Sequence, residues 1–381
     1  MNVTIQKDSL QWLVRTASRP IPSRSTFPAI KGCLIEAISD RLVFSGTNLD
    51  WGVRVSAEAQ VSSPGSVVVS SKILEDVVRT ISTGEVNLSL DESAWALVVR
   101  AGSSEMVLNA VPADDFPKWP EGKNGEKVTL KADLFREMVR VGATSAVANP
   151  ARPLWGACFL EFKDDRFVIV STDQFALSRA VANVQGKEAR AIISANVLSD
   201  IARLSDSEND DEIELIIAEN HIYLSTKSMS CFSRLIEGQY YPYEQVIRKV
   251  FSSSARVPTE SLLRAASRAA IVASEEDRAM RIILHKDAGT LTVKAGSPEK
   301  GRMEESFPAI INGEDVEIWV QHRYILQALD KIGTQDTFLG ISGLVSPMKL
   351  EPVDDKEEEE GKAIVEATYV VMPMSSPKGT F

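Results

Sequence analysis

The residue types that most often perform catalysis are few in this chain and poorly spaced for it. Its histidines are His221, His285 and His322, and none lies near a cysteine at metal-ligand spacing or in an HExxH pattern. The cysteines, at 33, 158 and 231, lie too far apart for a disulfide framework or a shared metal site. A GxxxxGK(S/T) phosphate loop and a GxSxG nucleophile elbow are also absent. We therefore expect no enzymatic activity, no metal and no cofactor.

Asp173 is the strongest candidate for a catalytic carboxylate. It lies in residues 170–174 (VSTDQ), and the similar run 45–49 (SGTNL) has Asn48 at the corresponding place. An amide can replace a carboxylate in a turn, where both accept backbone hydrogen bonds. We therefore interpret Asp173 as a turn-forming residue. Cys33 and Cys158 occupy matching positions of similar strands, which favours buried apolar residues over nucleophiles.

Positive charge is concentrated on six stretches with helical spacing, at 7–19, 72–81, 131–143, 196–204, 259–271 and 321–331. Together they hold thirteen basic and eight acidic residues, although the whole chain has a net charge of −11. One explanation is that any amphipathic helix has a basic outer face. A net positive charge summed over six equivalent helices of an acidic protein favours a shared basic surface for the phosphate backbone of nucleic acid.

Length and composition indicate a globular protein of two or three domains. The chain has 381 residues, of which 44% are hydrophobic and 25% charged, values typical of packed domains. No apolar run approaches the length of about 18 residues that a membrane span requires. The first residues lack the basic flank and apolar core of a secretory signal. We expect a reduced, cytoplasmic protein without membrane contact.

The helical stretches recur at fixed intervals, which indicates an internal repeat. Their lead leucines lie at 10, 134 and 262 in one set and at 74, 198 and 326 in the other, so the offset within each repeat is 64. Short β-rich runs bounded by turn residues lie between the helices, and closely spaced turns favour antiparallel pairing. The sequence therefore predicts an α+β fold of three repeated domains, each with two helices and antiparallel sheets.

The spacing also predicts the domain boundaries. We expect domains at 1–122, 127–248 and 249–374, followed by a tail at 375–381. Pro- and Gly-rich segments at 112–125 and 238–244 end the first two repeats. The acidic run at 354–361 has the composition of a solvated loop, which we favour over an acidic docking segment.

Several motifs resemble the β subunit of bacterial DNA polymerase III, the family of β sliding clamps. The most specific are residues 369–374 (YVVMPM), 232–238 (FSRLIEG) and 24–30 (RSTFPAI), and the resemblance extends over residues 1 to about 374. It implies the DNA-clamp fold, in which two chains form a head-to-tail dimeric ring with helices facing DNA. Such a clamp is a non-catalytic processivity factor that encircles duplex DNA and tethers the replicative polymerase.

The resemblance also implies positions for contacts with DNA and for ring closure. Arg24, Asn149 and Arg152 match family positions near DNA, and the helical faces add Lys72, Arg79 and Arg203. Met106 and Leu108 match one side of the dimer interface, and Ile271 and Val272 match the other, although all four could be ordinary core residues. The resemblance places the protein in the cytoplasm, at the nucleoid.

The family binds short peptides from the polymerase α subunit, the clamp loader, other polymerases and repair proteins in an apolar pocket. The matching residues are Trp155, Thr172, Leu177, Tyr241, Val246, Val345, Pro347, Val370, Met372, Pro373 and Met374. Such a pocket, with flexible methionines, suits varied linear motifs. The run Gln174-Phe175-Ala176, Trp155 and the extension beyond Met374 depart from the family pattern, which predicts an altered peptide preference.

Two functional hypotheses follow. The first is a sliding clamp, either a housekeeping clamp or a specialised one carried by a phage or plasmid. The second is a clamp-like scaffold that binds only proteins and no longer closes around DNA. The positive bias of the helices favours the first, because a protein-binding scaffold does not need it.

Overall fold

The computed structural model of the protein describes residues 1–82, 84–120, 125–205, 212–353 and 364–376. The acidic run at 354–361 and the end of the tail, 377–381, lie outside these residues. The described residues form six α-helices that agree with the predicted stretches to within two residues at each end. They are α1 (Lys7–Ala17), α2 (Ser71–Thr80), α3 (Ala132–Gly142), α4 (Ala195–Leu204), α5 (Thr259–Val272) and α6 (His322–Leu329). Four short 3-10 helices are η1 (Pro28–Lys31), η2 (Ala113–Asp115), η3 (Pro153–Gly156) and η4 (Tyr243–Val246).

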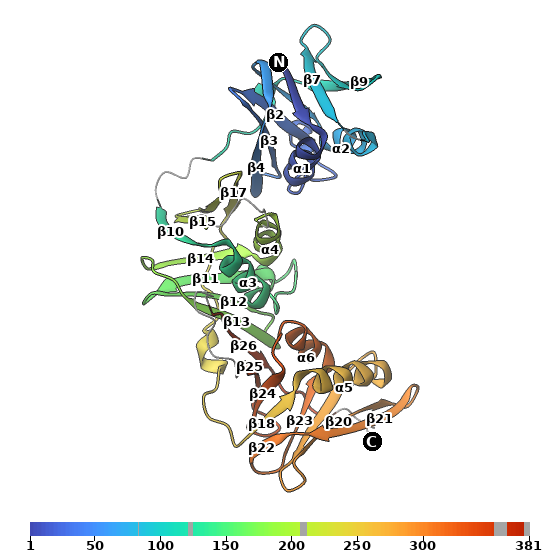
Figure 1. The fold of residues 1–381 in the computed structure, drawn as a ribbon. Helices are drawn as coiled ribbons and strands as arrows, with labels where there is room; N and C mark the ends of the chain where they lie inside the picture. Colours follow the sequence, from blue (N-terminus) through green and yellow to red (C-terminus); the bar gives the residue numbers. More distant parts are fainter. Residues whose placement is uncertain (83, 121–124, 206–211, 354–363, 377–381) are drawn as a thin grey trace. The chain divides into compact units, whose positions relative to one another are not determined.

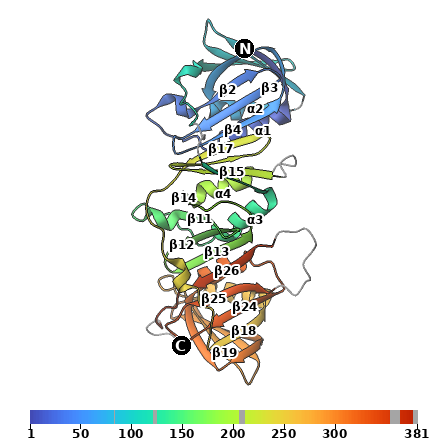
Figure 2. The same cartoon turned by 90° about the vertical axis from the view of Figure 1, so that its left-hand side faces the viewer.

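The chain divides into two compact units, one formed by residues 1–135 with 200–235 and the other by 136–199 with 236–381. The border between the units therefore runs through the middle repeat. The first unit contains one antiparallel sheet of thirteen strands. In sheet order these are β10 (Gly125–Lys131), β15 (Glu212–Ala218), β16 (His221–Ser225), β17 (Met229–Arg234), β4 (Trp51–Glu58), β3 (Arg41–Thr47), β2 (Gly32–Ile38), β6 (Gly65–Ser70), β9 (Ser104–Val111), β8 (Ala96–Ala101), β7 (Glu85–Asp91), β1 (Asn2–Gln6) and β5 (Gln60–Ser63). Figure 2 shows β2, β3, β4, β17 and β15 of this sheet.

The second unit contains two antiparallel sheets. The larger has nine strands, in the order β14 (Ala189–Ser194), β11 (Ala157–Lys163), β12 (Arg166–Thr172), β13 (Ala176–Asn183), β26 (Glu366–Val371), β25 (Met348–Val353), β24 (Asp336–Ile341), β18 (Ser253–Pro258) and β22 (Ile310–Gly313). The smaller has four, in the order β21 (Gly301–Pro308), β20 (Thr290–Ser297), β19 (Ala279–His285) and β23 (Val316–Gln321). The predicted α+β class with antiparallel sheets is confirmed.

Helices pack in pairs onto the sheets. In the first unit, α1 lies against α2 and against β3 and β4; in the second, α5 lies against α6 and against β20 and β21 (Figure 1). The lead leucines explain this packing, because Leu10, Leu74, Leu134, Leu198 and Leu262 are buried and Leu326 is partly buried. Burying one leucine stabilises the fold by about 1.5–3 kcal/mol. None of the described helices is long and apolar enough to cross a membrane.

Successive repeats are joined by strand pairing. β4 of the first repeat pairs with β17 of the second, with Gly52 opposite Phe232; this pairing is the first junction. β13 of the second repeat pairs with β26 of the third, with Leu177 opposite Val370; this is the second junction. Each junction lies within one compact unit. The C-terminal strand β26 thereby lies beside β13 and the turn that precedes it, although the two strands are far apart in the sequence.

Candidate functional site: the second junction and its pocket

The turn between β12 and β13 is held in shape by its own side chains. Thr172 Oγ1 donates to the Ala176 carbonyl at 2.7 Å and accepts the Gln174 N–H at 3.0 Å. Asp173 Oδ1 accepts the N–H groups of Phe175 and Ala176 at 2.9 and 2.8 Å. Gln174 has a φ of +73°, in the left-handed region that favours glycine. The prediction that Asp173 forms a turn is confirmed.

Asp173 also links this turn to the third repeat. Its carboxylate is buried, and Oδ2 accepts the Tyr324 hydroxyl at 2.6 Å. Arg323 Nη2 lies 4.0 Å from the same oxygen and donates to the Tyr324 hydroxyl. Burial, together with the bond to Asp173, raises the pKa of Tyr324, so the phenol stays protonated and keeps donating. The start of α6 is therefore fixed to the turn of the second repeat.

The segment that follows β26 crosses from the second repeat to the third. The Met372 N–H donates to the Phe175 carbonyl and the Met374 N–H to the Trp319 carbonyl, both at 2.8 Å. These two bonds hold the backbone of residues 372–374 between the turn and β23. The side chains of Met372, Pro373 and Met374 are half-buried at the surface.

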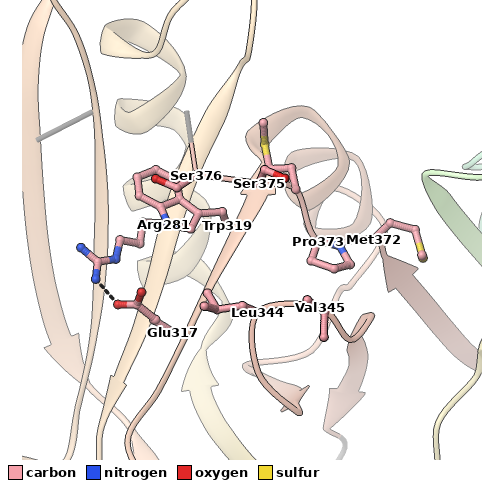
Figure 3. Close-up of a pocket in the computed structure, with 10 residues that line it drawn as sticks. Arg281, Glu317, Trp319, Leu344, Val345, Met372, Pro373, Ser375 and Ser376 are labelled. Atoms are coloured by element: carbon pink, nitrogen blue, oxygen red, sulfur yellow. Dashed lines mark hydrogen bonds and ion pairs between the residues drawn. The ribbon is translucent and has the colours of Figure 1, made fainter. Parts of the chain in front are cut away.

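A pocket with a volume of about 590 Å³ lies beside this segment. In Figure 3, the ion-paired Arg281 and Glu317 lie at one end, Pro373 and Met372 at the other, and Trp319 faces Leu344 and Val345 across the opening. The complete lining is Arg281, Glu317, Trp319, Leu344, Val345, Met372, Pro373, Met374, Ser375 and Ser376. Val345 is 89% exposed and Leu344 52%, so two apolar side chains stand at its rim. Its size and mixed lining suit a few side chains of a ligand.

The residues predicted to form one peptide pocket are distributed over neighbouring places. Val345, Met372, Pro373 and Met374 line the pocket. Leu177 and Val370 are buried in an apolar cluster with Tyr240 and Tyr243, and Tyr241 and Val246 pack against it from outside. Thr172 belongs to the turn, and Pro347 lies half-buried in the loop between β24 and β25. Whether a single peptide contacts all of these residues stays a prediction.

Trp155 lies in a small group of aromatic and basic side chains beside the turn. The Arg152 guanidinium lies over the Trp155 ring at 4.5 Å, and the Phe175 ring meets Trp155 edge-on with centroids 6.4 Å apart. Arg152 Nη1 also lies 3.5 Å from the Gln174 side-chain oxygen. Two departures from the family pattern, Trp155 and Gln174, therefore lie close to the same arginine beside the second junction.

Sequence reasoning missed part of the pocket lining: Arg281, Glu317, Trp319, Leu344, Ser375 and Ser376. Arg281 and Glu317 come from β19 and β23, 36 residues apart in sequence. Their pairing depends on a strand register that local patterns do not specify. The signal for Leu344 was its place beside the predicted Val345 in a turn-rich run, residues 342–347 (SGLVSP). Both side chains are exposed, and large apolar side chains on a surface often mark a binding site.

The predicted DNA-contacting residues are all at least partly exposed. Arg24, Lys72, Arg79, Arg152 and Arg203 are exposed, and Asn149 is half-buried. Asn149 Oδ1 accepts the Ala151 N–H, so its side chain shapes the loop. Arg79 and Arg203 form ion pairs with Asp76 and Asp200 on their own helices, at 2.7 and 3.4 Å.

Other helical arginines form similar pairs, including Arg140 with Glu137 and Arg264 with Glu260. Lys72 and Arg24, by contrast, form no ion pair within the described ranges. The positive bias of the helices is thus partly neutralised, which weakens the field available to a phosphate backbone.

The residues predicted to close a ring lie on the edge of β9 and at the C-terminal end of α5. On β9, residues 104–109 pair only with β8, because pairing with β6 involves only Ala110 and Val111. Met106 is half-buried and Leu108 buried on this strand. On α5, Ile271 is 70% exposed and Val272 half-buried. An exposed isoleucine and an open strand edge are features of an interaction surface.

The cysteines and histidines have the environments expected of structural residues. Cys33, Cys158 and Cys231 are buried, and burial raises the pKa of each thiol. His221 and His322 have lowered pKa values, chiefly because of burial and also because of neighbouring arginines. The described residues contain no group of three or more His, Cys, Asp or Glu side chains arranged to hold a metal ion.

The three repeats match three family models in order. The N-terminal domain of the DNA polymerase III beta subunit matches residues 1–120, its central domain 129–242 and its C-terminal domain 244–375. Beta sliding clamps of Pseudomonas putida and Streptomyces coelicolor are each 26% identical to this chain; the alignments cover 98% of it and 100% and 99% of those proteins.

Solved structures give the same result for the fold. The sliding clamp of Pseudomonas aeruginosa bound to griselimycin superposes with a TM-score of 0.91 at 24% identity, covering 99% of this chain and all of that one. The clamp of Bacillus subtilis has a TM-score of 0.91 at 21% identity with the same coverage. The fold is that of a three-domain DNA clamp. The chain belongs to the DNA polymerase III beta subunit family.

Proposed function

We propose that this protein is a DNA sliding clamp: a non-catalytic processivity factor that encircles duplex DNA and tethers a replicative polymerase. One observation carries the proposal. Three family models of one subunit match the chain in order and without a missing domain. The three-domain division at 1–122, 127–248 and 249–374 is part of the proposal. Such a protein would work in the cytoplasm, at the nucleoid.

DNA would be bound without reading of its bases. Exposed arginine and lysine side chains such as Arg24 and Lys72 suit contacts to phosphates, which position DNA but carry no sequence information. Contacts of this kind are individually weak and exchange readily in water and salt. A closed ring could therefore slide, because topology rather than affinity would keep it on DNA.

Ring closure would use a head-to-tail homodimer. The open edge of β9, with Met106 and Leu108, would meet the surface that carries Ile271 and Val272 on a second chain. A heterologous contact of this kind forms a closed ring when the rotation between subunits permits. Ile271 is 70% exposed in the single chain, and a large apolar side chain of this kind would be removed from water by such an interface.

Partner proteins would bind at the second junction through short linear motifs. The proposed partners are the polymerase α subunit, a clamp loader, other polymerases and repair proteins. Support comes from the pocket lined by Val345, Met372 and Met374, where flexible methionines can adapt to different peptides.

The test is retention on DNA of two topologies. The protein is loaded with a bacterial clamp loader and ATP onto a nicked circle, and half of the sample is then linearised. Retention on circles with loss from linear DNA is the expected result. Equal retention on both would indicate ordinary phosphate binding. Absence from both, when a control clamp loads, would favour the alternative of a protein-binding scaffold with altered partners.

A further inference from the structure

The second helix of each repeat carries a basic residue at the same place near its C-terminal end. Arg79 lies in the last turn of α2 and Arg203 in the last turn of α4, 124 residues later. Lys331 follows the end of α6, after a further 128 residues. These intervals are those of the lead leucines of the same helices, so the three basic side chains occupy equivalent positions of the repeat.

In the first two repeats this basic residue is paired with an aspartate one turn earlier. Arg79 Nη2 lies 2.7 Å from Asp76 Oδ1, and Arg203 Nη1 lies 3.4 Å from Asp200 Oδ1. The arginine side chains are 74% and 71% exposed. The two aspartates are also 124 residues apart. The ion pair therefore recurs together with its helix.

The third repeat has the same kind of pair with a different spacing. Ala328 stands where Asp76 and Asp200 stand in the other repeats. Lys331 is paired instead with the adjacent Asp330, at 2.7 Å. The hydrogen bond from Lys331 lowers the pKa of Asp330, so this carboxylate keeps its negative charge. In all three repeats the basic side chain at this position is thus held by a carboxylate of its own helical stretch.

Helix stability explains these aspartates poorly. Asp76 and Asp200 lie inside their helices, where aspartate has a lower helix propensity than glutamate. Asp330 is the C-cap residue of α6, where the helix dipole disfavours a negative charge. Exposed ion pairs also contribute little to folding. The recurrence of the pair at one position of the repeat therefore points to a use other than folding.

A carboxylate beside an arginine competes with a phosphate for the same guanidinium, because both anions accept charge-assisted hydrogen bonds from it. The carboxylate also repels the phosphate. We infer that Asp76, Asp200 and Asp330 act as built-in competitors that weaken the contacts between the second helices and the phosphates of double-stranded DNA. This inference rests on the proposed function, because it names what limits the affinity of the ring for the DNA on which it slides.

The first test measures DNA binding after two of the aspartates are neutralised. The full chain is titrated into a fluorescein-labelled linear duplex at several salt concentrations, and fluorescence anisotropy is recorded. Asp76→Asn/Asp200→Asn should bind at least about threefold more tightly at low salt. The slope of log K against log salt concentration should become steeper by about one for each arginine that gains a phosphate contact. Unchanged affinity and slope would overturn the inference.

A matched control adds the same charge away from the helices. Glu214 pairs with Lys127 and Glu366 with Arg166, and all four residues lie on β-strands. Glu214→Gln/Glu366→Gln should therefore leave the salt slope as it is in the unaltered chain. An equal change in this control and in the aspartate variant would show that net charge alone is responsible, which overturns the inference.

A further comparison separates competition from simple repulsion. Asp76→Asn should tighten binding only while Arg79 is present, so Asp76→Asn/Arg79→Ala should bind no more tightly than Arg79→Ala. A gain that persists without Arg79 would mean that the carboxylate only repels phosphate, and competition would be refuted. Asp330→Asn, at a side chain 69% exposed, is an independent variant and should also tighten binding.

Retention on circular DNA separates this inference from the proposed function. If the chain is retained on circles but the aspartate variant binds the duplex as the control does, competition is refuted and the clamp function stands. If the aspartate variant binds more tightly with a steeper slope but no chain is retained on circles, the competition is supported and the clamp function is refuted. Absence of duplex binding by every variant at low salt would refute both.

Discussion

The two junctions between repeats contain equivalent turns, but different side chains pack at each of them. At the first, Thr47 Oγ1 donates to the Trp51 carbonyl and accepts the Leu49 N–H, both at 2.9 Å. Asn48 Oδ1 accepts the N–H groups of Asp50 and Trp51 at 3.0 and 2.9 Å. Every one of these bonds has a counterpart 125 residues later in the turn that begins at Thr172. The conformation of the turn is therefore common to both repeats.

The strands that follow these turns differ in what they bury. At the first junction Phe232 lies on Gly52, and the Trp119 ring meets the Phe232 ring edge-on at 4.8 Å. At the second, Leu177 lies opposite Val370, and the chain continues past Val370 along the wall of a pocket. The same antiparallel pairing of strands thus gives a first junction packed with aromatic rings and a second junction beside an open pocket. The identity of two opposed residues and the course of the next segment decide which one forms.

The largest expected effect on stability comes from Gly52→Leu, which places at the first junction the residue type that Leu177 provides at the second. A Cβ atom at Gly52 would lie 2.4 Å from the Phe232 ring, so Gly52→Leu forces the ring to move. Overpacking of this kind costs about 1–3 kcal/mol. The first unit should unfold at lower urea concentration, as followed by tryptophan fluorescence. Adding Phe232→Val, the residue type of the second junction, should recover part of the loss; no recovery would show that the two junctions are not interchangeable.

The next effect separates the two roles of Asp173. Asp173→Asn keeps an oxygen for the turn, as Asn48 does, but removes the carboxylate that accepts the Tyr324 hydroxyl. Loss of a hydrogen bond to a charged group should cost about 1–2 kcal/mol in the second unit. Asn48→Asp should cost less, because the bonds of Asn48 are confined to its own turn. Calorimetry of both variants beside Tyr324→Phe tests this, and equal losses at 48 and 173 would remove the distinction.

A smaller and opposite effect is expected at the left-handed positions. Leu49 and Gln174 have φ values of +76° and +73°, where a Cβ atom is disfavoured by about 1–2 kcal/mol. Leu49→Gly and Gln174→Gly should each raise the stability of the unit that contains it by roughly 0.5 kcal/mol, after the added chain entropy of glycine is included. Thermal unfolding measures the gain. A loss at 174 alone would mean that its contact with Arg152 matters more than the backbone strain.

The smallest expected effect is a dependence on pH that both units share. The pKa values of His221 and His322 are lowered mainly by burial, so the folded state favours neutral imidazole. Their contribution to stability is present above the ordinary pKa of about 6.5 and is lost as the pH falls below it towards the folded-state pKa. Titration by NMR should place both below that ordinary value. A value above it at either position would contradict the assigned environment.

The repeat, the six helices and the two turns could be predicted from local patterns of residues. The leucines at fixed spacing predict the helices because each helix buries one apolar stripe, and Leu10, Leu74 and Leu262 are buried as that pattern requires. Asn48 and Asp173 predict equivalent turns because short polar side chains accept bonds from the next few backbone N–H groups. These are local properties, so a local pattern is sufficient to find them.

The residues that line the pocket, and those that pack at the first junction, could not be predicted in this way. Arg281 meets Glu317 through the register of β19 and β23, and Tyr324 reaches Asp173 across 151 residues of sequence. Gly52 and Phe232 likewise meet only because β4 pairs with β17. Such contacts depend on how distant strands pair, and a one-residue change of register would direct every side chain of a strand to its other face. For that reason the local pattern predicts the elements, and the folded chain determines the site.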